Sequence, residues 1–108
     1  MSYASYCLDN WYLLDSKQPI SLDNVALINN FLGGVDEDWF VTIHVCIEDA
    51  AAPAVKSAFE IVSETNETNI LQHLKIIQTS LKKMNEIFDR VPEKCDPYIY
   101  YHRVRPYI

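Results

Sequence analysis

Glycine is scarce in this chain of 108 residues, which contains only two. Folds built from strands alone need many tight turns, and such turns draw heavily on glycine. The scarcity therefore predicts an all-α chain and argues against barrels and sandwiches. The length allows at most one small domain.

Cysteine and basic clusters are also sparse. Cys7, Cys46 and Cys95 lie far apart and form no CxxC pair, so neither a zinc site nor a disulfide framework is expected. Reduced thiols in the cytoplasm are the default interpretation. Nine Lys and Arg stand against fifteen Asp and Glu, which gives a net charge of −6. Nucleic acid is not an expected partner, because phosphate backbones are bound by clustered basic side chains.

Several familiar signals are missing. No apolar run approaches the roughly 18 residues that cross a membrane, so no membrane partner is expected. The start at Met1 lacks the basic and apolar regions of a signal peptide. Gly33-Gly34 is not followed by the sequence of a phosphate loop, and the acidic residues 36–38 lack the spacing of a calcium loop. No Ser/His/Asp or Cys/His arrangement for nucleophilic catalysis can be assembled.

What the chain does contain is helical periodicity, most clearly over residues 67–91. Apolar side chains recur there at spacings of three and four, the pattern of one stripe on an amphipathic helix. Pro92 ends this segment. The stripe consists of Ile70, Leu74, Ile77, Leu81, Met84 and Phe88.

Residues 39–62 are apolar around most of a helical circumference. The alternation of Val41, Ile43 and Val45 would suit a strand, but the length and the alanine run 50–52 favour a helix. The acidic residues 36–38 suit its first turn, because they complement the positive end of the helix. We expect Pro53 to end or kink this helix near Ala52, with a second segment through Phe59.

The remaining segments are short. Residues 3–15 mix aromatic and aliphatic side chains and can be helical, whereas residues 21–24 suit a turn or a helix cap. Val25, Leu27 and Ile28 form an apolar patch of uncertain type. Asp96-Pro97 predicts another helix over residues 98–108, with Asp96 as its cap and Pro97 in its first turn.

The last predicted helix has the most unusual composition. Five tyrosines or histidines and two arginines fall within residues 98–107. Aromatic rings beside arginine can form a pocket that stacks a flat ring and holds a carboxylate through the guanidinium group. The plain alternative is that the tyrosines pack half-buried while the arginines lie in solvent.

Histidines offer a second candidate feature. Phe40 and His44 are four residues apart and share a helical face. His44 is either a core residue hydrogen-bonded to a backbone carbonyl or a group that faces a pocket. His73 lies one position from the apolar stripe, which indicates a surface or boundary role.

Three segments together resemble the indoleamine 2,3-dioxygenase family. Residues 96–108 (DPYIYYHRVRPYI) are similar to the part of that family where aromatic residues precede an arginine. Residues 39–52 (WFVTIHVCIEDAAA) resemble its distal-side helix, and residues 19–24 (PISLDN) resemble the linker before that helix. The resemblance spans essentially the whole chain in order.

The resemblance implies an all-α domain with haem b, in which iron binds dioxygen. The implied reaction cleaves the C2–C3 bond of the indole of tryptophan, or of another indoleamine, to N-formylkynurenine in the cytoplasmic kynurenine pathway. Phe40 and Tyr100 match aromatic residues that enclose the indole, and Tyr101 adjoins them. Arg105 matches the arginine that holds the substrate carboxylate or supports the aromatic wall. His44 stands where vertebrate members have a serine, and as a catalytic residue it would hydrogen-bond to the indole N–H or to bound oxygen.

The resemblance also implies that much of the family's domain is absent. None of His44, His73 and His102 aligns with the family's iron-ligating histidine, so no metal ligand is expected in this chain. We expect a fragment, with residues 1–35 as the end of a preceding region and linker, and residues 36–108 as part of the large haem domain. Without the axial ligand, the fragment alone is expected to be inactive. Its unpartnered apolar helices predict poor solubility.

Two other functions stay open. An oxygen-storage haem protein is possible because some invertebrate myoglobins resemble these dioxygenases, although a carrier has no need for Arg105. A non-catalytic helical module that merely shares the pattern is the third.

Overall fold

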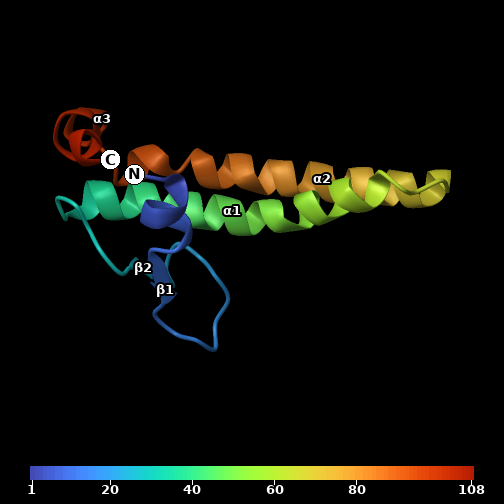
Figure 1. Ribbon diagram of the computed structural model, residues 1–108, viewed down its shortest axis with the longest axis horizontal. Helices are drawn as coiled ribbons and strands as arrows, with labels where there is room; N and C mark the ends of the chain where they lie inside the picture. Colours follow the sequence, from blue (N-terminus) through green and yellow to red (C-terminus); the bar gives the residue numbers. More distant parts are fainter.

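The computed structural model describes all of residues 1–108 and is mostly helical. Two long helices, α1 (Val35–Ile61) and α2 (Glu67–Phe88), run antiparallel side by side and form the long axis of the molecule (Figure 1). This confirms the predicted helical class, to which the structure adds one small two-stranded hairpin.

The residues just before α1 determine where the helix starts. Gly33 and Gly34 have positive φ values of 84° and 100°, which residues with a side chain rarely adopt, so the double glycine makes the turn into the helix. The acidic residues lie in the first turn as predicted. Glu37 does more than complement the helix end. It is 2% exposed, and its carboxylate accepts hydrogen bonds from the backbone N–H groups of Phe31, Leu32 and Gly33 at 2.7–2.9 Å.

Of the two effects expected of Pro53, an end or a kink of the helix near Ala52, the structure contradicts the end. The helix continues through Pro53 to Ile61. A proline inside a helix removes one backbone hydrogen bond, but packing against a neighbouring helix can outweigh that loss. Here Ala50 and Ser57, on either side of Pro53, are both 4% exposed in the helix pair.

Helix α2 begins as its sequence indicates, but the face that it buries contains only half of the predicted stripe. Asn66 caps it by accepting from the N–H groups of Thr68 and Asn69, and it ends three residues before the predicted residue 91. Half of the predicted stripe is exposed, because Leu74, Leu81 and Phe88 are each more than half exposed. The less exposed positions are Ile70, His73, Ile77, Ser80, Met84 and Ile87.

The N-terminal region corrects a second expectation. Residues 3–15 are helical only in one turn (η1, Ala4–Leu8), after which β1 (Trp11–Leu13) pairs antiparallel with β2 (Val25–Leu27). The patch of uncertain type is therefore a strand over residues 25–27. The loop between the strands is held by the buried Asn24, whose amide donates to the carbonyls of Asp15, Gln18 and Pro19.

The hairpin packs on the first half of α1 through a small apolar core of Cys7, Val25, Val41 and Val45. Figure 1 shows both strands on one side of that helix. The three cysteines are buried and form no disulfide. No helix is long and apolar enough to cross a membrane.

The C-terminal segment folds back onto the start of α1 (Figure 1). After a single turn (η2, Val91–Glu93), α3 (Pro97–Ile99) continues without a break into η3 (Tyr100–Val104) and η4 (Arg105–Tyr107). Asp96 accepts from the N–H groups of Tyr98 and Ile99, and Pro97 occupies the first turn, as predicted. The helical segment over residues 98–108 is confirmed, although its hydrogen-bond pattern changes along its length.

Candidate functional site

Three of the predicted site residues meet between α1 and the C-terminal segment. The ring of Phe40 stacks on that of Tyr100, with 4.0 Å between centroids and 28° between planes. The ring of His44 lies 4.4 Å from that of Phe40. All three are partly buried. We call Phe40, His44 and Tyr100 the aromatic cluster.

The hydrogen bond of His44 determines which of its two ring nitrogens carries the proton. Nδ1 lies 2.7 Å from the backbone carbonyl oxygen of Phe40. A carbonyl can only accept, so Nδ1 carries the proton, and in the neutral ring Nε2 remains as an acceptor. The bond to a backbone carbonyl that the sequence allowed for His44 is therefore present. The ring nevertheless stays accessible.

Tyr3 joins this region from the N-terminal turn, which sequence reasoning missed. Its ring meets His44 edge-on at 6.2 Å between centroids, and its hydroxyl donates to Oε1 of Glu48 at 2.9 Å. Burial raises the pKa of Tyr3 well above its ordinary value, and hydrogen bonding with Cys7 and Glu48 adds to the rise. Tyr3 is therefore a neutral hydrogen-bond donor. Nothing in the local sequence connects it with a helix 40 positions later.

Tyr101 and Arg105 form a separate pair on the surface. Tyr101 is 56% exposed, and the guanidinium carbon of Arg105 lies 5.2 Å from the centre of its ring. Neither ion pair of the chain involves Arg105, so its charge faces no carboxylate. Burial raises the pKa of Tyr100, and the nearby charge of Arg105 opposes that rise. Arg105 therefore lies close enough to Tyr100 to favour its charged form.

The aromatic cluster fits one wall of a site for a flat ligand. Because Phe40 and Tyr100 lie on each other at 4.0 Å, no ring can enter between them. The larger surface hollows are lined by other residues. No group of three or more His, Cys, Asp or Glu side chains converges as a metal site would require. These residues do not by themselves hold a haem, and they offer it at most one face.

Comparisons with known proteins match the whole chain to one family. The model of the family "Indoleamine 2,3-dioxygenase" matches residues 1–108. Indoleamine 2,3-dioxygenase 1 of Mus musculus is 35% identical over 112 residues, which cover 100% of this chain and 27% of that protein. The Rattus norvegicus protein of the same name is 32% identical over 111 residues, again with 100% and 27% covered. Indoleamine 2,3-dioxygenase of Saccharomyces cerevisiae is 23% identical over 117 residues, covering 99% and 26%. The chain thus spans about a quarter of the length of these relatives.

Proposed function

Because the chain belongs to the indoleamine 2,3-dioxygenase family, we propose that it forms part of the distal wall of a haem site for tryptophan oxidation. The proposed reaction breaks the C2–C3 bond of the indole, adds one atom of dioxygen to each of these two carbons and yields N-formylkynurenine, in the cytoplasmic kynurenine pathway. Other indoleamines are alternative substrates. Haem b, when bound, supplies the activation of dioxygen.

One observation carries the proposal: Phe40, His44 and Tyr100 meet although Tyr100 lies 60 positions beyond Phe40 in the sequence. Aromatic rings with one accessible face suit a flat indole, which gains from stacking and from leaving water. We propose that the open side of the aromatic cluster is that face. In this role the cluster orients the indole and excludes water.

We assign His44 the role of hydrogen-bond acceptor. Its Nδ1 proton is engaged by Phe40, so the neutral ring has only an acceptor to offer through Nε2. The indole N–H is a donor, whereas bound oxygen would need a donor from the protein. This favours the indole N–H among the two partners that the sequence left open.

We propose that Arg105 and Tyr101 bind the carboxylate end of the substrate. The guanidinium group of Arg105 has no carboxylate partner in the chain and lies on the ring of Tyr101, which restricts its motion. A substrate carboxylate would supply the missing partner through paired hydrogen bonds.

The axial iron ligand is proposed to lie outside these 108 residues, so that the chain alone is inactive. In this proposal residues 1–35 end a preceding region and linker, and residues 36–108 belong to the large haem domain. The two parts share the core of Cys7, Val25, Val41 and Val45, which indicates that they stay together.

The experiment is a chimera in which this chain replaces the matching segment of the mouse relative. We expect a Soret band and formation of N-formylkynurenine from tryptophan. Arg105→Ala should lower kcat/KM for tryptophan about 10- to 100-fold, because a charged hydrogen-bond partner is lost. Arg103→Ala, on the same exposed segment, is the matched control and should change little.

The alternatives give different results in the same chimera. Stable oxygen binding without tryptophan turnover would favour an oxygen-storage protein. A folded chimera without a Soret band would contradict any haem role for this segment. Equal losses from Arg103→Ala and Arg105→Ala would refute the assignment of the substrate carboxylate to Arg105.

A further inference from the structure

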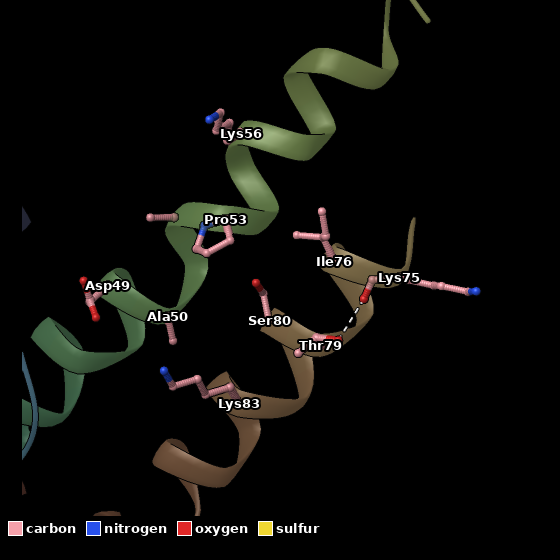
Figure 2. Close-up of a pocket in the computed structure, with 10 residues that line it drawn as sticks. Asp49, Ala50, Pro53, Lys56, Lys75, Ile76, Thr79, Ser80 and Lys83 are labelled. Atoms are coloured by element: carbon pink, nitrogen blue, oxygen red, sulfur yellow. Dashed lines mark hydrogen bonds between the residues drawn. The ribbon is translucent and has the colours of Figure 1, made fainter. Parts of the chain in front are cut away.

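A groove of about 850 Å³ lies between α1 and α2 (Figure 2). None of the residues that line it belongs to the aromatic cluster. The groove exists because small side chains face each other there: Ala50 and Pro53 on α1, and Ser80 on α2. Its size falls within the range of about 300–1,000 Å³ typical of small-molecule sites.

Ser80 presents its hydroxyl to the groove. The residue is only 5% exposed, and Figure 2 shows this hydroxyl directed toward Pro53 without a hydrogen bond to any of the residues drawn. No buried side-chain polar atom of the chain lacks a hydrogen-bond partner, so the Ser80 oxygen is reached from the groove rather than sealed in the interior. Pro53 has no N–H, so the backbone carbonyl of Asp49 lacks its usual helical donor. The groove therefore offers hydrogen-bonding groups as well as apolar surface.

Lysines surround the groove in an otherwise acidic chain. Lys56, Lys75 and Lys83 line it, together with a single acidic side chain, Asp49. The two ion pairs of the chain lie elsewhere, so none of these lysines is paired. Figure 2 shows the amino group of Lys83 directed across the groove toward Ala50, whereas the side chains of Lys56 and Lys75 extend away from it. Lys83 is therefore the cation that faces the groove.

The apolar residues that line the groove indicate what the uncharged part of a ligand would be. Ala52, Pro53 and Ile76 provide aliphatic surface, and no aromatic side chain lines the groove. A flat ring would find nothing to stack on, whereas a flexible alkyl chain can follow the helices. We propose that this groove binds an aliphatic carboxylate of the fatty-acid type. The carboxylate lies on Lys83 and Ser80, and the alkyl chain lies along Pro53 and Ile76. This site is independent of the aromatic cluster and of the proposed reaction.

The test measures hydrogen exchange of the 108-residue chain by mass spectrometry, at low protein concentration, with octanoate or octanol. These two probes share an alkyl chain and differ in charge. Octanoate should protect peptides that cover residues 49–56 and 75–83, with a half-saturating concentration about three- to tenfold below that of octanol. Equal binding of the two probes would overturn the proposal, as would protection confined to other peptides.

Two neighbouring lysines provide the matched variants. Lys83→Gln should remove the preference for octanoate, whereas Lys82→Gln, which does not line the groove, should keep it. Equal effects of both would mean general charge attraction and would contradict a built site. Ser80→Leu should block both probes by filling the groove. If circular dichroism shows that this variant is unfolded, Ser80→Ala replaces it and should weaken octanoate binding alone.

Discussion

At the scale of single residues, the backbone bond of His44 decides what its ring can do. A histidine that donates through Nδ1 to the carbonyl four residues earlier is held in one orientation along its own helix. The Tyr3 ring closes a second side of it, and Tyr3 is itself anchored to Glu48. The remaining nitrogen therefore points in a defined direction as an acceptor.

This orientation predicts discrimination by the indole N–H. In the chimera, tryptophan should be turned over faster than its analogue methylated on the indole nitrogen, which cannot donate. His44→Ala should reduce that ratio about threefold to tenfold, as expected for the loss of one hydrogen bond. Competition between the two substrates measures the ratio directly. An unchanged ratio in His44→Ala would remove His44 from substrate recognition.

Buried thiols predict how stability depends on pH. Burial, assisted by the charge of Asp49, raises the pKa of Cys46 from its ordinary value near 9 to about 11. The unfolded chain loses this proton at lower pH than the folded one, so stability is full below pH 9 and falls between pH 9 and 11. The loss is at most about 1.4 kcal/mol per pH unit for one group.

Urea unfolding at a series of pH values from 8 to about 10 would measure this effect. Cys46→Ala should flatten the dependence only in part, because burial also raises the pKa of Cys7 and Cys95. Stability that rises with pH over this range would contradict the assignment.

At the scale of elements, α1 carries its weakest point in its middle. Pro53 leaves the carbonyl of Asp49 without a helical donor, yet the helix continues because both flanking turns pack on α2. The sequence predicted an end or a kink here, and the predicted end did not allow for this packing.

Replacing this proline should therefore stabilise the chain. Pro53→Ala restores one backbone hydrogen bond and introduces the best helix former, and we expect the free energy of unfolding to rise by about 1–2 kcal/mol. Ala54→Gly, at the next position, should lower it by about 1 kcal/mol. Circular dichroism during urea unfolding measures both. A less stable Pro53→Ala variant would show that the groove needs the proline ring.

The sequence predicts the elements that depend on neighbouring residues better than those that depend on distant contacts. The caps at Asn66 and Asp96 and the length of α2 depend on neighbouring residues, so α2 and the C-terminal segment follow from the sequence. Which face of α2 is buried depends on the side chains of α1 opposite it. Ser57 of α1 forms a hydrogen bond of 3.2 Å with His73, so a histidine lies there instead of an aliphatic side chain. The strands are only three residues long and are stabilised by pairing across a loop, which leaves no periodic pattern. The aromatic cluster was partly predictable, since Phe40 and His44 are one helical turn apart. The contact of Tyr3 with His44 and the hydrogen bonds of Glu37 to the loop before α1 were not, because no local sequence pattern indicates them.

At the scale of the whole molecule, the chain is extended and exposes many large apolar side chains. Its radius of gyration is 16.4 Å, compared with about 13 Å for a compact chain of this length. Its accessible surface is 7399 Å², compared with about 6,200 Å² for a compact monomer of this size. Near the free end of the helix pair, Phe59 and Val62 are 83% and 86% exposed.

We expect this end to drive self-association of the isolated chain. Phe59→Ser/Val62→Ser should raise the concentration at which light scattering increases, because it removes contiguous apolar surface. Tyr12→Ser, at an exposed ring on the hairpin, is the control and should have a smaller effect. A chain that stays monomeric at high concentration without these changes would contradict the prediction of poor solubility.

The buried carboxylate of Glu37 also limits how the molecule can be divided. The flexible double glycine would ordinarily be chosen as the point at which to cut the chain for a split-protein pair or a circular permutation. A cut there would free the three N–H donors of residues 31–33 and strand a negative charge in the interior. The turn at residues 62–66 is the better point for new termini, since it joins the two long helices through exposed backbone.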